Sequence, residues 1–147
     1  MDQVYTGGCA CGAIRYEVAG EPVVMNDCQC RQCQYDSGTG HASYLTFAAA
    51  QVALSGAPSS WDFTGDGGTV KRRAFCPLCG TPVYLTFPAM PDIFVIRAGS
   101  LDDPGRYRAE MVFWTEMAQR WDHLDPAALK FERMPPDPVL ESEGPST

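Results

Sequence analysis

Basic residues are scarce in this sequence, and their scarcity argues against a nucleic-acid-binding protein. The chain has 11 Lys and Arg residues against 18 Asp and Glu residues, which gives a formal net charge of −7. Nonspecific binding to nucleic acid depends on clustered Lys and Arg side chains that displace counterions from the phosphates. We therefore expect no nucleic acid among the primary partners.

Long apolar runs are also missing. No segment approaches the ~20 consecutive apolar residues that a membrane-spanning helix needs. The first residues, Met1-Asp2-Gln3, do not show the basic and then apolar pattern of a signal peptide. We expect a cytoplasmic protein that has no membrane partner.

The composition that remains is that of an ordinary globular protein. Hydrophobic residues make up 45% and charged residues 20% of the 147 residues, a length and a balance that fit one domain. Proline, glycine and glutamate accumulate from Pro135 onward with few apolar residues, so this segment has little to bury. The sequence predicts a single domain over residues 1–134 and a disordered tail over residues 135–147.

Short runs of β-branched and aromatic residues, separated by turn residues, predict a mainly β fold with little helix. The alternation in residues 13–18 indicates a half-buried strand, and residues 63–75 read as a hairpin with Gly65-Asp66-Gly67-Gly68 at its tip. We expect a helical turn at residues 126–129 and a loop at residues 28–33. Further strands are expected at residues 43–47, 83–87, 93–96 and 111–114.

Seven cysteines are the most informative residues of the chain. They form three tight clusters, Cys9-x-Cys11, Cys28-x-Cys30-x-x-Cys33 and Cys76-x-x-Cys79. An odd number of cysteines cannot pair completely into intramolecular disulfides, and the reducing cytosol keeps thiols unpaired. Thiolates at these spacings are typical zinc ligands, so zinc is the expected cofactor.

The segment Cys76-Pro77-Leu78-Cys79-Gly80 has the form of a zinc knuckle, in which a tight turn brings two thiolates onto one metal ion. Gly80 allows the backbone to curl behind the sulfur atoms. A structural zinc takes four ligands, so a second pair of cysteines must complete the site. Cys9 and Cys11 are the natural pair.

The remaining cysteines, Cys28, Cys30 and Cys33, form a local group without a fourth cysteine. Zinc with three protein ligands and an open fourth position is the arrangement of catalytic sites. A small thiol that binds there would lose its proton. This interpretation predicts one structural and one catalytic zinc in each chain.

Other interpretations of the second group stay open. Asp27, Asp36 or His41 would close the site if one of them supplied a fourth ligand, and both zinc sites would then be structural. A second hypothesis is that the protein is a non-catalytic, zinc-stabilised binding module that holds a protein partner on its β surface. A third possibility is redox sensing, because exposed thiolates of low pKa oxidise and release zinc.

Lys71-Arg72-Arg73 is the only cluster of positive charge in the chain. Alternation along a strand places Lys71 and Arg73 on one face and Arg72 on the other. An anionic thiol needs such a patch to approach a protein of negative net charge, although a solvated strand edge also explains these residues. Trp114 and Trp121 either wall a pocket or belong to the core.

Three motifs occur in a specific order and spacing. They are Gly7-Gly8-Cys9-Ala10-Cys11-Gly12-Ala13-Ile14-Arg15-Tyr16-Glu17, Cys28-x-Cys30-x-x-Cys33 and Phe75-Cys76-Pro77-Leu78-Cys79-Gly80-Thr81-Pro82. Together they resemble the glutathione-dependent formaldehyde-activating enzyme family. The resemblance continues through residues 98–104 and 114–116 to Trp121.

This resemblance implies a mostly antiparallel β-tent fold built around two zinc sites. It implies a structural zinc at Cys9, Cys11, Cys76 and Cys79, and a second, catalytic zinc at Cys28, Cys30 and Cys33. The activity that it implies joins formaldehyde to glutathione, and the reverse reaction is that of a carbon–sulfur lyase. We therefore expect a zinc-dependent, carbon–sulfur lyase-like enzyme whose partner is a small thiol such as glutathione.

Overall fold

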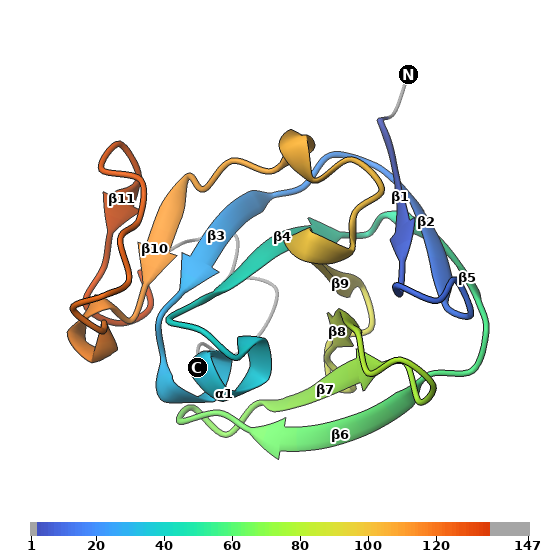
Figure 1. Cartoon of the computed structure of the whole chain (residues 1–147), viewed down its shortest axis with the longest axis horizontal. Helices are drawn as coiled ribbons and strands as arrows, with labels where there is room; N and C mark the ends of the chain where they lie inside the picture. Colours follow the sequence, from blue (N-terminus) through green and yellow to red (C-terminus); the bar gives the residue numbers. More distant parts are fainter. Residues whose placement is uncertain (1–2, 136–147) are drawn as a thin grey trace.

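The computed structural model describes residues 3–135, which form two open β-sheets. The smaller sheet has three antiparallel strands in the order β1 (Val4–Gly8), β2 (Arg15–Ala19) and β5 (Gln51–Ser55). Figure 1 shows this sheet beside the larger one, with the turn between β1 and β2 at one end.

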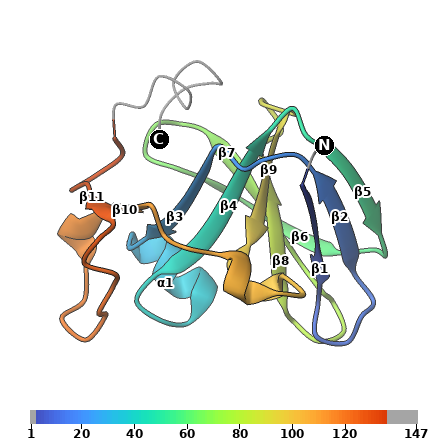
Figure 2. The same cartoon turned by 90° about the horizontal axis from the view of Figure 1, so that it is seen from above.

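The larger sheet has eight strands and contains most of the regular structure. Their order is β11 (Leu129–Lys130), β10 (Met111–Phe113), β3 (Val24–Cys28), β4 (Ala42–Ala48), β9 (Ile93–Arg97), β8 (Pro82–Thr86), β7 (Val70–Phe75) and β6 (Ser59–Thr64). All neighbours from β3 to β6 are antiparallel, whereas β10 pairs in parallel with both β3 and β11. Figure 2 shows β10 and β11, one edge of this sheet, at the left of the molecule and the small sheet at the right. The prediction of a mainly β, mostly antiparallel fold is confirmed.

Each predicted strand corresponds to a strand of the structure. Residues 13–18 contain most of β2, and the predicted hairpin is β6 and β7, joined by a turn in which Gly68 has a φ of +88°. The strands expected at 43–47, 83–87, 93–96 and 111–114 are β4, β8, β9 and β10. Strands β1, β3, β5 and β11 were not predicted. β5 and β11 are mostly exposed, so they lack the apolar alternation that marks a strand.

The core lies mainly between the two sheets. Tyr16 and Val18 of β2 are buried there, and they alternate with the more exposed Arg15 and Glu17 as the sequence predicts. Phe47 of β4 is fully buried in the same cluster. This packing fixes the positions of the strand ends from which the cysteines project.

Residues 28–33 were predicted to form a loop, and this prediction was wrong for residues 31–33, which belong to a helix. β3 ends at Cys28, and α1 (Arg31–Ser37) begins three residues later with Cys30 as its N-cap. The Sγ atom of Cys30 accepts a hydrogen bond from the backbone N–H of Cys33 at 3.4 Å, as a serine or aspartate oxygen does in other N-caps. Gly38, with a φ of +76°, ends the helix.

The helical turn expected at residues 126–129 is a hydrogen-bonded turn that leads into β11. Within the described residues, α1 is the only α-helix, and three short 3-10 turns lie at Ala98–Ser100, Pro104–Arg106 and Thr115–Met117. No helix in residues 3–135 is long and apolar enough to cross a membrane. The predicted tail lies outside the described residues apart from Pro135, so the boundary between domain and tail stays a prediction.

Candidate metal centres

The two cysteine pairs that the sequence assigns to one site lie together in the structure. The Sγ atoms of Cys9, Cys11, Cys76 and Cys79 are all within 4.8 Å of one another. Cys9 and Cys11 lie in the turn after β1, and Cys76 and Cys79 lie in the turn between β7 and β8. We call these residues the four-thiol group. Four thiols gathered at this spacing match the donor set of a tetrahedral structural zinc.

Backbone N–H groups point at the sulfur atoms of the four-thiol group. The Cys9 Sγ atom accepts from the N–H of Ile14 at 3.2 Å, and the Cys76 Sγ atom accepts from the N–H of Cys79 at 3.5 Å. Hydrogen bonds from Thr81 lower the pKa of Cys79 to about 5. Gly80 has a φ of +77°, the conformation that lets this turn close. Donors of this kind stabilise the thiolates that bind metal.

The other three cysteines also lie together, and we call them the three-thiol group. The Sγ atoms of Cys28, Cys30 and Cys33 are within 4.8 Å of one another. They come from the end of β3, the N-cap of α1 and the first turn of α1. In the part of the chain that the structure describes, no carboxylate or imidazole belongs to this group of ligand atoms.

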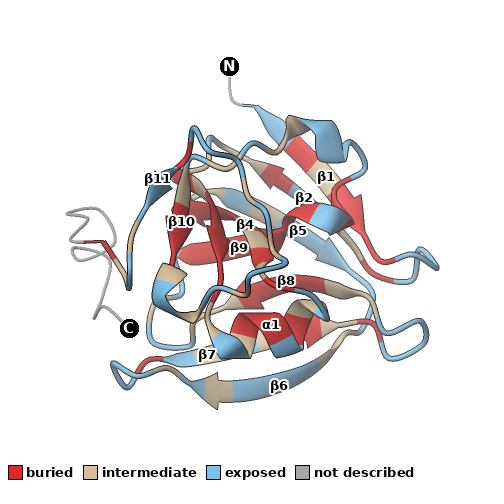
Figure 3. Cartoon of the chain, turned by 60° about the vertical axis from the view of Figure 1, so that its left-hand side comes forward, coloured by how far each residue is buried: buried red, intermediate tan, exposed pale blue. Residues whose placement is uncertain are grey.

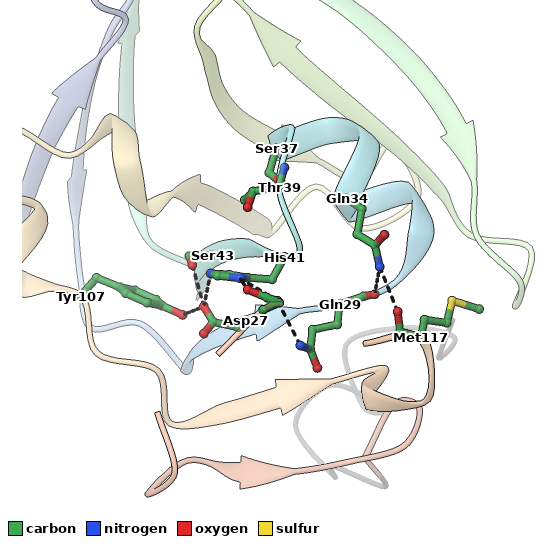
Figure 4. Close-up of polar contacts among 10 residues, drawn as sticks. Asp27, Gln29, Gln34, Ser37, Thr39, His41, Ser43, Tyr107 and Met117 are labelled. Atoms are coloured by element: carbon green, nitrogen blue, oxygen red, sulfur yellow. Dashed lines mark hydrogen bonds and ion pairs between the residues drawn. The ribbon is translucent and has the colours of Figure 1, made fainter. Parts of the chain in front are cut away.

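Two of the alternative ligands, Asp27 and His41, are engaged elsewhere. The carboxylate of Asp27 accepts hydrogen bonds from Ser43 Oγ and from the hydroxyl of Tyr107, both at 2.6 Å. The Nδ1 atom of His41 lies 2.9 Å from a carboxylate oxygen of Asp122. Figure 4 shows Asp27, Ser43, His41 and Tyr107 as one polar cluster.

The third alternative ligand, Asp36, forms ion pairs that fix α1 to the large sheet. Its carboxylate lies 2.5 Å from the guanidinium of Arg97 on β9 and 2.9 Å from that of Arg73 on β7. Burial raises the pKa of Asp36, and the two arginines oppose that shift. Figure 3 shows the buried stripe of α1, which contains Cys33, Gln34 and Asp36.

The thiols of the three-thiol group differ strongly in acidity. Hydrogen bonds from Cys28 and Cys33 lower the pKa of Cys30 to about 3, and the nearby charge of Lys71 adds to this effect. Hydrogen bonds with Cys30 and Cys33, together with burial, raise the pKa of Cys28 well above its usual value. Cys28 acts to lower the pKa of Cys33, but Cys30 and burial outweigh it and raise that pKa to about 12. Without metal, Cys30 therefore carries the single negative charge of the group.

Tyr44 is a functional candidate that sequence reasoning missed. Its hydroxyl lies 3.1 Å from the Sγ atom of Cys33. Burial raises the pKa of Tyr44 well above its usual value, so the phenol stays protonated and donates to the sulfur when Cys33 is a thiolate. No motif marks this residue, because its contact depends on the pairing of β4 with β3.

Amide side chains tie the three-thiol group to the segment that follows β10. The side-chain NH₂ group of Gln34 donates to the carbonyl oxygens of Gln29, at 2.8 Å, and Met117, at 3.0 Å (Figure 4). The side-chain NH₂ group of Gln29 donates to Asp122 at 3.1 Å. These bonds hold residues 114–122 beside the cysteines, although the segments are far apart in the sequence.

A cavity of about 420 Å³ opens beside the three-thiol group. All three cysteines line it, together with apolar side chains from β8, β9 and β10. Trp114 also lines the cavity and is buried in the same apolar cluster as Cys28 and Cys33, so both interpretations of this residue hold. Both were wrong for Trp121, which is 61% exposed and neither lines the cavity nor belongs to a hydrophobic cluster. Lys71 lines the cavity, whereas Arg72 forms an exposed ion pair with Asp62, as the strand alternation predicts.

Comparisons with known proteins concern the fold and the family of this chain. A crystal structure of a Rhodobacter sphaeroides protein superposes with a TM-score of 0.51 and 21% identity, covering 66% of this chain and 87% of that one. At this identity the likeness concerns the fold alone. The family model described as glutathione-dependent formaldehyde-activating enzyme matches residues 4–117, which include all seven cysteines. The chain therefore belongs to the glutathione-dependent formaldehyde-activating enzyme family.

Proposed function

We propose that this protein is a zinc-dependent, carbon–sulfur lyase-like enzyme that acts on the adduct of a small thiol, such as glutathione, with an aldehyde. In the forward direction the thiol sulfur adds to the carbonyl carbon, and the thiol proton ends on the carbonyl oxygen. In the reverse direction the carbon–sulfur bond breaks and the proton returns to sulfur. Family membership supports this class of reaction, and we place the protein in the cytoplasm, where thiols stay reduced.

The observation that carries the proposal is the contrast between the two groups of cysteines. Four thiols complete the ligand set of a structural zinc at the four-thiol group, whereas the three-thiol group has no fourth ligand among the described residues and faces a cavity. We assign the structural zinc to the four-thiol group and the catalytic zinc to the three-thiol group. A zinc ion there supplies a Lewis-acidic position that lowers the pKa of a bound thiol.

The surrounding residues support this chemistry by distributing negative charge. Tyr44 donates to Cys33, and the ammonium group of Lys71 acts on Cys30. Both contacts offset the charge that collects when several thiolates share a small space. Trp114 and Phe113 are buried and line the cavity, so they limit the access of water to a reacting carbon.

A Cys30→Ser variant tests the proposal. Serine retains the N-cap hydrogen bond of α1, so we expect the fold to persist while the three-thiol group loses its most acidic ligand. Two measurements apply, the number of zinc ions bound to each chain and the rate of exchange between formaldehyde, glutathione and their adduct, followed by nuclear magnetic resonance.

We expect two zinc ions and accelerated exchange in the wild type, and one zinc ion and the buffer rate in Cys30→Ser. Tyr35→Ser is the matched control, because Tyr35 is an exposed residue of the same helix. If the zinc-loaded wild type accelerates exchange with no thiol, the enzyme proposal is contradicted and a non-catalytic binding module is favoured.

A further inference from the structure

Four polar side chains lie in the buried lining of the cavity beside the three-thiol group. They are Asn26, Tyr44, Thr46 and Thr69, and each is at most 9% exposed. Buried polar groups in proteins nearly always have hydrogen-bond partners. The hydroxyl of Tyr44 has such a partner in the Sγ atom of Cys33. A buried polar side chain that lines the cavity without a partner therefore marks a position that a ligand can complete.

Asn26 is such a residue. It is only 4% exposed, yet its carboxamide has no hydrogen-bond partner among residues 3–135. A carboxamide offers two N–H donors and one oxygen acceptor. Because Asn26 lines the cavity, these groups are free to bind a molecule that enters it.

The strand pairing places this carboxamide next to the three-thiol group. Asn26 and Cys28 are two residues apart on β3, roughly 6.5 Å along the strand, so both side chains point to the same face and line the cavity. Across the sheet Asn26 pairs with Tyr44 of β4, whose hydroxyl contacts Cys33. Figure 1 shows β3 between β10 and β4. A small molecule whose sulfur lies at the cysteines therefore has its nearest atoms beside Asn26.

The adduct of a thiol with an aldehyde has an oxygen atom at this distance from its sulfur, because both atoms are bonded to the same carbon. When the sulfur adds to the carbonyl carbon, one electron pair of the C=O bond moves to the oxygen. The oxygen develops negative charge and takes up the proton that the sulfur gives up. An N–H group that donates to this oxygen stabilises the transition state more than the uncharged aldehyde.

We infer that Asn26 is a catalytic residue, whose side-chain NH₂ group donates a hydrogen bond to the substrate oxygen while the carbon–sulfur bond forms or breaks. The carboxamide neither gains nor loses a proton in this step. The inference rests on the proposed function, since it assigns a further residue of the same site. It concerns the aldehyde part of the adduct, whereas the three-thiol group concerns the sulfur.

Asn26→Leu tests the inference, because leucine has a similar size and cannot donate a hydrogen bond. We expect the zinc-loaded variant to bind two zinc ions per chain, and to bind glutathione as tightly as the wild type in calorimetric titration. Its exchange rate at saturating glutathione and formaldehyde should fall by about 100-fold or to the buffer rate. A residue that only supports the fold would not separate binding from rate in this way.

The stability of the variant provides a second readout. A buried carboxamide without a partner opposes folding, so an apolar replacement should not destabilise the protein. We expect Asn26→Leu to unfold at the same denaturant concentration as the wild type or at a higher one. Asn26→Ala removes the same group without adding volume. Earlier unfolding of both variants would show that the carboxamide supports the fold, and would overturn the inference.

Thr46→Val is the matched control. Thr46 is also buried and lines the cavity, but it pairs with Val24, one side-chain pair farther from Cys28 than Asn26 is. The exchange rate of Thr46→Val should stay near that of the wild type. An equal loss of rate in Thr46→Val and Asn26→Leu would refute the inference, because the effect would not depend on the position beside the cysteines.

Three further results separate the inference from the proposed function. An unchanged exchange rate in Asn26→Leu would refute the inference and leave the proposed function standing. A loss of glutathione affinity that accounts for the whole loss of rate would do the same, because Asn26 would then bind the thiol and not the aldehyde oxygen. A zinc-loaded wild type that does not accelerate exchange would overturn both.

Discussion

Cys30 is the residue that sets the charge of the three-thiol group before metal arrives. It carries a pKa of about 3, whereas the pKa values of its two neighbours, Cys28 and Cys33, are raised. A cation is attracted by the one thiolate and must displace the protons of the other two thiols. The affinity of the group for metal is therefore tied to pH.

We predict that zinc binding at the three-thiol group releases about two protons near pH 7, because Cys28 and Cys33 are both protonated there. The affinity of the three-thiol group for zinc then rises by about 100-fold for each pH unit between about pH 6 and 8. Titration calorimetry in buffers of different ionisation enthalpy counts the protons that are released. The same titration of Cys30→Ser gives the contribution of the four-thiol group, which is then subtracted. Release of one proton or fewer contradicts the assigned acidities.

Tyr44 provides a second prediction at this scale. Tyr44→Phe removes the hydroxyl that donates to Cys33 and leaves the packing in place. Loss of such an outer hydrogen bond typically weakens metal binding by about 10–100-fold. Competition with a chromogenic chelator measures this change.

Tyr84→Phe is the control for Tyr44→Phe, because Tyr84 is also buried but packs in the other hydrophobic cluster. The four-thiol group should hold its metal equally well in both variants. Equal zinc affinity of the three-thiol group in Tyr44→Phe and wild type would remove the role given to this hydroxyl.

Sequence reasoning predicted the grouping of all seven cysteines, and the structure brings the same sets together. The grouping was predictable because short spacings and the coordination number of zinc restrict the partitions. Tyr44 and the apolar walls were not predictable, because each depends on which strands are neighbours. Leu85 and Val95 are adjacent only through the pairing of β8 with β9.

Besides strands β1, β3, β5 and β11, the sequence pattern did not reveal α1. It has seven residues, too few for an apolar repeat, and its N-cap is a cysteine rather than a serine or aspartate. Most predicted strands were recognisable as short runs of β-branched and aromatic residues, and β9 is buried along its whole length. What holds α1 in place is the buried carboxylate of Asp36 between Arg97 and Arg73.

We predict that Asp36→Asn destabilises the fold by about 3 kcal/mol, because it leaves the buried Arg97 without its counter-charge. Denaturant unfolding measures the loss. Asp62→Asn is the control; it removes an exposed ion pair with Arg72 and should change stability little. Equal stability of Asp36→Asn and wild type would show that the ion pairs do not anchor α1.

At the scale of the whole molecule, the four-thiol group joins the two sheets. The turn after β1 belongs to the small sheet, and the turn between β7 and β8 belongs to the large one. Residues 9 and 76 are far apart in the sequence, so a metal ion that links these turns constrains the chain strongly. The three-thiol group lies within one short segment and has less effect on the fold.

We therefore predict opposite consequences for the two groups. Cys76→Ser should lower the unfolding temperature by about 10 °C or more, whereas Cys30→Ser should change it only slightly. Differential scanning calorimetry of both variants at the same zinc concentration makes the comparison. A larger loss in Cys30→Ser than in Cys76→Ser would reverse the structural and catalytic assignments.

The central claim is that the three-thiol group leaves one coordination position for a small thiol. Anomalous diffraction at the zinc absorption edge, from crystals grown with a small thiol such as glutathione, tests it directly. The account predicts zinc bound by Cys28, Cys30 and Cys33, with the sulfur of the added thiol as its fourth ligand. A fourth ligand supplied by the protein itself, or no zinc at these three residues, would contradict it.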